Sequence, residues 1–247
     1  MSIPSCEDFS QAAETNGLSV ETIFETAADP LLRLARDGAS NKPVILISAG
    51  IHGDEPAPVI ALFNLLNDHF FSSENFDWRI YPILNPTGLK LGTRENAEGI
   101  DLNRDFLDTR SPEVLAYKSS LEAEGSIDMS LNLHEDWEAS GFYLYALSPD
   151  NARNYGETIL KSVGECGPIE KSESVDGHPI SDGLILPLEF VNEDSLNDGW
   201  PEAIHLYRTK PHIHFTMESP SCLPIKTRVD MQIQAVKTAV GLMGSLH

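Results

Sequence analysis

A short apolar run followed by a polar turn constrains the fold more than any other part of the sequence. Val44–Ser48 carries no charge and has apolar side chains on both faces, which is typical of a strand buried on both sides in a parallel or mixed sheet. Pro56 suits the first turn of a helix. Apolar residues then recur at helical spacing, namely Val59, Ile60, Leu62, Phe63, Leu65 and Leu66. The residues between the run and Pro56 are therefore expected at a strand-to-helix junction.

Other strands and helices are expected to alternate along the chain. Strands are predicted at Ser19–Glu25, Leu31–Ala35, Trp78–Leu84, Ile127–His134, Phe142–Leu147 and Ile213–Glu218. Helices are predicted from Ser111, over Asn151–Val163 and over about Arg228–Leu246. This order predicts an α/β fold, a three-layer α/β/α sandwich. The length suits one domain, residues 1–247, in which residues 1–40 form an amino-terminal segment with edge strands.

Charge and composition exclude several classes of protein. The 17 basic and 38 acidic residues give a net charge of −21, which argues against a nucleic-acid partner. Met1–Ser10 contains Glu7 and Asp8 instead of a basic region, and no run of about 18 apolar residues follows anywhere. The three cysteines form no Cys-X-X-Cys pair, so free thiols are expected. The sequence predicts a cytoplasmic protein without a membrane partner.

Three residues are candidate metal ligands. His52 and Glu55 are three positions apart in the predicted junction, and His134 ends a predicted strand. Loops that leave the carboxyl ends of neighbouring strands meet at one edge of an open α/β sheet. Zinc accepts nitrogen and oxygen ligands, and a catalytic zinc site uses three protein ligands with one position left open. A lone histidine at a strand end is more often a polar cap than a ligand, so the neighbouring residues decide the interpretation.

The segment between these candidates is rich in polar groups. Residues 94–106 place two arginines and two asparagines on an irregular loop. Glu218 ends a later predicted strand. Each of these side chains alone has an ordinary structural explanation: Glu55 suits the first turn of a helix, the arginines can pair with nearby acids, and Glu218 can be a solvated strand end. Their order along the chain is more informative than any one of them.

That order resembles the zinc metallocarboxypeptidases of the carboxypeptidase A and B type over roughly Val44 to Ser219. The matching residues are His52 and Glu55, Asn85-Pro86-X-Gly88, Arg94 with Asn96, Gly99 and Asp101-Leu102-Asn103-Arg104, His134, and Thr216-Met217-Glu218. The resemblance implies an eight-stranded mixed sheet flanked by helices, one Zn²⁺ ion, and hydrolysis of an amide next to a free carboxylate. The short chain is more similar to compact bacterial members, including murein peptide amidases, and to the related aspartoacylase and succinylglutamate desuccinylase deacylases.

The same resemblance implies a metal site and a base. It gives His52, Glu55 and His134 as the zinc ligands and Glu218 as the general base that accepts a proton from the attacking water. Such a base is typically worth about 10² to 10⁴ in rate. A carboxylate is also expected to orient a ligand imidazole, and we expect one more distant than Glu135, because adjacent strand residues point to opposite faces.

Substrate contacts are implied in the same way. Arg94 corresponds to the group that stabilises the oxyanion, and Asn103 with Arg104 corresponds to the pair that binds the substrate carboxylate. The planar fork of arginine suits two-point binding of a carboxylate. The family usually carries a mobile tyrosine over the substrate, and Tyr207 is the nearest candidate here.

The leading hypothesis is a zinc metallocarboxypeptidase that removes a C-terminal residue from a peptide. An amidase or deacylase of N-acyl amino acids or murein peptides is the alternative, and an inactive zinc-binding family member is the second alternative. Side-chain preference stays open, although one of Asp176, Asp182 and Asp194 could attract a basic side chain. His212 and His214 share one face of a strand; they could bind a second ion, but a pair of surface or core histidines without an ion is favoured.

Overall fold

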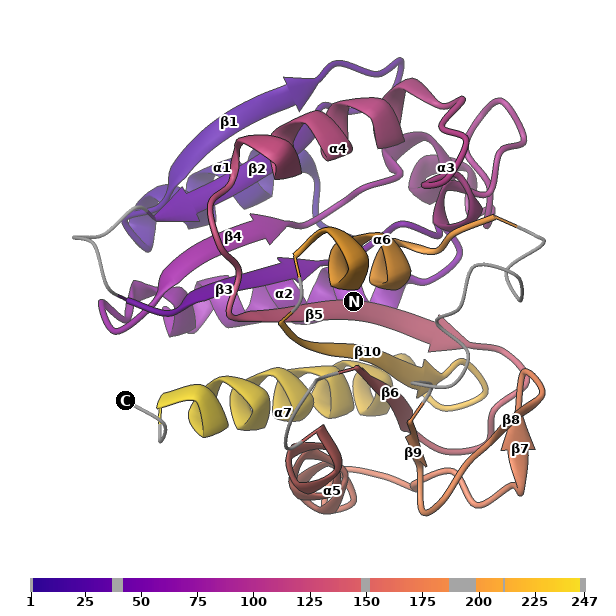
Figure 1. Cartoon of the computed structure of the whole chain (residues 1–247). Helices are drawn as coiled ribbons and strands as arrows, with labels where there is room; N and C mark the ends of the chain where they lie inside the picture. Colours follow the sequence, from indigo (N-terminus) through magenta and orange to yellow (C-terminus); the bar gives the residue numbers. More distant parts are fainter. Residues whose placement is uncertain (1, 37–41, 148–151, 187–198, 211, 245–247) are drawn as a thin grey trace.

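The chain folds around one large mixed sheet with helices on both faces (Figure 1). The computed structural model describes residues 2–36, 42–147, 152–186, 199–210 and 212–244. The eight strands follow the order β1-β2-β4-β3-β5-β10-β6-β9. Their bounds are β1 Ser19–Phe24, β2 Leu31–Arg36, β3 Val44–Ser48, β4 Asp77–Tyr81, β5 Met129–Asp136, β6 Tyr143–Leu147, β9 Leu184–Ile185 and β10 Ile213–Pro220. A separate hairpin pairs β7 Ser174–Val175 with β8 His178–Pro179.

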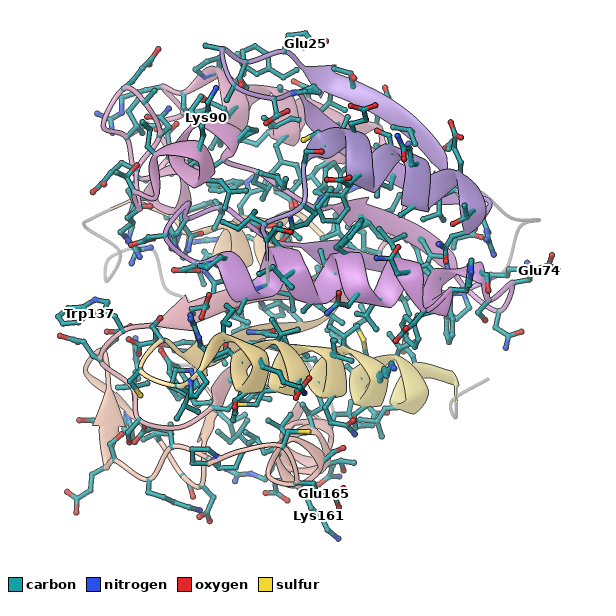
Figure 2. All side chains as sticks on the ribbon, turned by 180° about the vertical axis from the view of Figure 1, so that it is seen from behind. Glu25, Glu74, Lys90, Trp137, Lys161 and Glu165 are labelled. Carbon is teal, nitrogen blue, oxygen red and sulfur yellow. The ribbon has the colours of Figure 1, made fainter. Side chains whose placement is uncertain are left out.

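Helices cover each face of the sheet. Their bounds are α1 Cys6–Thr15, α2 Pro56–Asn67, α3 Pro86–Leu91, α4 Pro112–Ala123, α5 Ala152–Val163, α6 Glu202–Thr209 and α7 Ile225–Gly244, with 3-10 turns η1 Phe70–Ser72 and η2 Leu102–Arg104. Figure 2 shows α2 and α7 side by side in front of the sheet, whereas Figure 1 shows α4 and α6 in front of the opposite face. The result is the expected three-layer α/β/α sandwich.

The alternation of β3 explains why both faces need covering. Ile45 and Ile47 belong to the larger core, which includes Leu62 and Leu65 of α2. Leu46 points the other way and joins the core formed with α4 and α6. All three strand residues are fully buried. The prediction that this strand is covered on both faces is confirmed.

Several elements differ from the sequence-based expectation. The predicted polar amino-terminal segment contains α1, which Ser5 caps and which buries Phe9 and Ala13 against the larger core. The turn-rich stretch after β4 contains α3, capped by Asn85, and η2. These helices are short or mostly polar, so periodicity gives little signal for them. The expected helix limits at Asn151 and Leu246 lie outside the described residues.

Glu170 fixes the loop before β6 to the loop that follows Pro168. Its carboxylate accepts hydrogen bonds from the backbone N–H groups of Ser140, Gly141, Lys171 and Ser172, at 2.8 to 2.9 Å. Desolvation opposes ionisation, but these four donors outweigh it and lower the pKa of Glu170 to about 2. The carboxylate therefore stabilises the fold only while it is ionised.

We expect Glu170→Gln to lower the free energy of unfolding at pH 7, because an amide cannot accept four N–H bonds. The folded pKa lies below the unfolded value, so the wild-type advantage is complete above about pH 4.5 and declines as the pH falls toward 2. Urea unfolding of both proteins from pH 7 to pH 3 measures this difference. Glu74→Gln, at an exposed side chain, is the matched control. A difference that does not change with pH would contradict the assignment.

Candidate metal centre and active site

Three parallel strands bring the predicted site residues to one edge of the sheet. β5 pairs in parallel with both β3 and β10, so the carboxyl ends of all three strands meet. The register places Glu218 of β10 directly beside His134 of β5. A cavity of about 900 Å³ opens there, and seven of the eight predicted site residues line it: His52, Glu55, Arg94, Asn103, Arg104, His134 and Glu218.

The three candidate ligands converge on a small volume. His52 Nδ1 lies 2.5 Å from Glu55 Oε1, and His134 Nδ1 lies 3.1 Å from Glu55 Oε2. One potential ligand atom from each residue lies within 4.8 Å of the others, and all three residues are buried. Ligand atoms about 2.0 to 2.2 Å from one zinc ion are themselves about 3.4 Å apart, so small side-chain rotations suffice to share an ion. The donor set therefore fits zinc.

Asp101 completes the surroundings of His52. The second ring nitrogen, His52 Nε2, is buried and lies 3.3 Å from Asp101 Oδ1, but it forms no well-aligned hydrogen bond with the described residues. If Nδ1 binds a metal, Nε2 must carry the proton, and a carboxylate at Nε2 favours that tautomer. Asp101 is held in turn by Arg94 Nε at 3.0 Å. It is a carboxylate distant in sequence from either histidine, and the sequence motif contains it without revealing this role.

The electrostatics of the triad match a cation site. Burial disfavours ionisation of Glu55, but the two adjacent imidazoles outweigh burial and lower its pKa. Burial likewise opposes protonation of His52 and His134, yet the Glu55 carboxylate raises the pKa of both. The buried carboxylate therefore favours positive charge at this position, whether it comes from protons or from a metal ion.

Gly53 is needed because two backbones almost touch beside the ligands. A Cβ atom at Gly53 would lie 1.9 Å from the carbonyl carbon of Gly88 and 2.2 Å from the nitrogen of Leu89. Asn85 holds that segment, since its Oδ1 accepts from Gly88 N at 2.8 Å and its Nδ2 donates to Ile51 O. The ligand turn and α3 are therefore packed backbone against backbone.

We expect Gly53→Ala to reduce the free energy of unfolding by about 1 to 3 kcal/mol or more, because backbone must move to admit the methyl group. Gly241→Ala is the matched control, since a Cβ at that α7 position meets no atom within 4 Å and alanine favours helix. Urea unfolding of the metal-free proteins compares the two substitutions. Equal stability of both variants would contradict the close packing.

Glu218 faces the same cavity from β10 and is half-buried. Desolvation raises its pKa, and the nearby carboxylates Glu55, Asp136 and Asp176 raise it further, against the opposing effect of His134. A cation held by the triad would lower that pKa again. The carboxylate can then accept a proton near neutral pH, as a general base requires.

Two arginines and an asparagine also line this cavity. Arg94 Nη1 lies 3.3 Å from His52 Nδ1 and 3.8 Å from Glu55 Oε1, so its guanidinium adjoins the metal position. Asn103 Oδ1 accepts from the backbone N–H of Glu202 at 2.9 Å, and its Nδ2, which donates no hydrogen bond within the described part of the chain, can donate to another partner. Arg104 is exposed and lines the cavity next to Asn103.

Tyr207, the candidate for the tyrosine that covers the substrate, lies outside the cavity. Tyr207 is a half-buried residue of α6 and does not line the cavity. Tyr143 and Tyr145 of β6 line it instead, and their hydroxyls donate to Asp136 Oδ2 at 2.9 Å and Asp176 Oδ2 at 3.2 Å. The sequence predicts a strand at Phe142–Leu147 but does not show that this strand pairs with β10 beside the cavity.

Glu135 and the pair of His212 and His214 lie outside the cluster of candidate metal ligands. The Glu135 carboxylate is held by α2 and α7: it accepts from Ala57 N at 2.7 Å and pairs with Arg228. His212 and His214 both contact Ser130 in the core, and among the described residues the one cluster suited to a metal ion is His52, Glu55 and His134.

The fold and the site together place this chain among the metallopeptidase-like hydrolases. It belongs to the family of the succinylglutamate desuccinylase/aspartoacylase catalytic domain, whose model matches residues 41–168. It is 30% identical over 155 residues to the succinylglutamate desuccinylase of Burkholderia pseudomallei, a match that covers 56% of this chain and 44% of that protein. It is 40% identical over 68 residues to murein peptide amidase A of Escherichia coli, covering 28% of this chain and 27% of that protein. The predicted family resemblance is confirmed.

Solved structures agree with the fold. A protein from Shewanella amazonensis, provisionally classed as a metallopeptidase, superposes with a TM-score of 0.83 at 26% identity, covering 96% of this chain and 91% of that one. Carboxypeptidase A from Helicoverpa armigera shares the fold, with a TM-score of 0.70 at 15% identity over 98% of this chain and 74% of that one. Among the described residues, no helix is both long and apolar enough to cross a membrane.

Proposed function

We propose that this chain is a zinc-dependent metallocarboxypeptidase that hydrolyses the C-terminal peptide bond of a peptide. One observation carries the proposal: the ligand triad, Glu218 and the two arginines line the same cavity, with Glu218 in register beside His134. A metal site alone would serve many functions. A metal site that shares its cavity with a carboxylate base and two arginines is suited to hydrolysis beside an anionic group.

Each residue has a role that its position supports. His52, Glu55 and His134 would hold a zinc ion, which when bound would supply a Lewis acid to polarise a carbonyl and acidify water. Glu218 accepts a proton from the attacking water and then donates it to the leaving amine. Arg94 stabilises the negative charge that develops on the carbonyl oxygen, a contribution of about 3 to 4 kcal/mol for a preorganised donor.

Asn103 and Arg104 bind the terminal carboxylate. Arg104 offers a two-point fork on the exposed side of the cavity, and Asn103 offers the Nδ2 donors that the Glu202 backbone leaves free. These contacts select a substrate that ends in a free carboxylate over an internal peptide bond. Trp137 lines the cavity, is 78% exposed and projects from the edge of the molecule (Figure 2). The cavity is therefore open to solvent beside Trp137, which supports the binding of a peptide.

The family match supports a second candidate, the deacylation of N-acyl amino acids. The chain matches the desuccinylase/aspartoacylase catalytic domain over residues 41–168. Such a substrate also ends in a free carboxylate beside an amide, so the same residues could process it. The chain spans less than half the length of the curated desuccinylases it matches, and their activity is therefore only a candidate here.

A substrate panel separates the two proposals. The zinc-loaded protein is tested on blocked dipeptides with C-terminal Lys, Arg, Leu or Glu, on N-succinyl and N-acetyl amino acids, and on a murein tripeptide. We expect the highest kcat/KM on the dipeptides and none on the same dipeptides with an amidated C-terminus. Faster hydrolysis of the N-acyl amino acids would establish the second candidate instead. Zinc bound at one equivalent with no turnover on any substrate would support an inactive zinc-binding protein.

A further inference from the structure

A chain of buried hydrogen bonds leads from the floor of the cavity into the core. Thr216 Oγ1 lies 2.9 Å from His214 Nε2, and His214 Nδ1 lies 2.6 Å from Ser130 Oγ. Ser130 Oγ also lies 2.5 Å from His212 Nε2, and His212 Nδ1 contacts the carbonyl oxygen of Lys210. Ser130, His212 and His214 are buried. The mechanism above uses none of these residues.

The Lys210 carbonyl determines which group donates in each of these hydrogen bonds. A carbonyl oxygen only accepts, so His212 Nδ1 must carry a proton. Burial lowers the pKa of both histidines, and the neighbouring imidazoles lower that of His214 further, so both rings are neutral and each holds a single N–H. His212 Nε2 is then an acceptor, which makes the Ser130 hydroxyl its donor.

The same logic continues to the cavity. The Ser130 hydroxyl donates its single proton to His212. The Ser130 oxygen must therefore accept from His214 Nδ1–H. His214 Nε2 is therefore an acceptor, and the Thr216 hydroxyl must donate to it. Thr216 lines the cavity with its only proton already used. Its oxygen can only accept a hydrogen bond from whatever occupies the cavity.

A second acceptor lies beside Thr216. Asn132 is its register partner on β5 and also lines the cavity. Asn132 is 1% exposed, its Nδ2 donates to Ser48 Oγ at 2.7 Å, and its Oδ1 has no hydrogen-bond partner among the described residues. A buried carbonyl without a donor is unfavourable, so a ligand that supplies a donor is favoured.

A carboxylate, that of Asp176, lines the same cavity as the Thr216 and Asn132 acceptors. Tyr145 is the partner of Thr216 on the other side, in β6, and its hydroxyl donates to Asp176, which lines the cavity. Thr216 lies two residues before Glu218 on the same strand face, so Thr216 and its register partners Asn132 and Tyr145 lie about 6.6 Å from the base along the strands. A long side chain of the terminal substrate residue can span that distance.

We propose that Thr216, Asn132 and Asp176 form a pocket that selects a C-terminal residue with an amine-bearing, basic side chain. An ammonium group has three hydrogen-bond donors and no acceptor, which complements two neutral acceptors and one carboxylate. The proposal rests on the proposed function to the extent that a substrate carboxylate sits on Asn103 and Arg104. It holds equally for a peptide and for an N-acyl amino acid, because the terminal residue is the same in both.

The decisive comparison is lysine against norleucine, which has the same chain without the ammonium. We expect kcat/KM for a blocked dipeptide ending in lysine to exceed that for the norleucine dipeptide by about 10-fold or more, since hydrogen bonds to a charged group are worth that much. Binding of the free amino acids to the zinc-loaded Glu218→Gln variant, measured by calorimetry, should show the same preference. Calorimetry needs no turnover, so a failure of the proposed peptidase activity leaves this test intact.

Substitutions at Thr216 test the pocket itself. Thr216→Val removes the acceptor at nearly constant volume and should reduce the lysine-to-norleucine ratio toward one, whereas Thr216→Ser should retain it. Thr238→Val, which removes a half-buried hydroxyl of α7 that bonds Gln234, is the matched control and should keep the wild-type ratio. Thermal unfolding shows whether each variant is folded. The proposal is overturned if the wild-type protein turns over and binds norleucine as well as lysine, or if Thr216→Val keeps the full ratio.

Discussion

Replacement of Glu218 by glutamine should reduce hydrolysis by about 10² to 10⁴ while leaving zinc binding intact. Glutamine has nearly the same shape, but its amide cannot accept a proton at neutral pH. Glu218 is not one of the three clustered ligand side chains, so the metal site should survive the change. The two measurements are the zinc content of the purified variant and its kcat on the best substrate of the panel.

The control for this substitution is Glu138→Gln, which makes the same change of charge at an exposed residue of the same cavity. We expect this variant to keep activity within a few-fold of wild type, because a rim charge mainly affects substrate association. Equal losses in both variants would show that net charge of the cavity, and not proton transfer at Glu218, limits the rate. Full activity of the Glu218 variant would remove it from the mechanism.

The part of the fold nearest the site follows from local sequence patterns. β3 has the predicted bounds and α2 begins at the predicted Pro56, because a strand apolar on both faces and a proline at a first helical turn are strong local signals. The resemblance then supplied the eight-stranded sheet, which the structure confirms. The roles of the predicted site residues stay predictions, although seven of them line one cavity.

Contacts between distant segments could not be predicted in this way. Asp101 lies beside His52 only because η2 folds back over the ligand turn, and no spacing rule encodes that approach. Ser130 joins His212 and His214 because β5 and β10 pair in parallel across more than eighty residues of sequence. Pairing between strands far apart in the chain depends on the whole sheet, so single-sequence patterns do not fix it.

Replacement of His134 by asparagine should abolish both activity and high-affinity zinc binding. His134 is 3% exposed and its Nδ1 contacts Glu55, so the substitution removes one of three nitrogen or oxygen ligands from a buried site. Two remaining protein ligands are too few for a stable catalytic zinc site. His69→Asn is the matched control, because His69 is exposed and has a positive φ of 55°, a conformation that asparagine tolerates.

Thermal unfolding gives a readout of this loss that does not depend on turnover. A metal ion that binds only the folded state at about 100 times its Kd adds about 2.7 kcal/mol, which for a domain of this size raises Tm by about 5 to 10 °C. We expect that increase when zinc is added to the metal-free wild type and to His69→Asn, and no increase for His134→Asn. Restoration of activity by zinc after chelation should follow the same pattern. A zinc-dependent rise in Tm that persists in His134→Asn would contradict the assignment, because it would show that zinc binds the folded protein without the complete cluster of His52, Glu55 and His134.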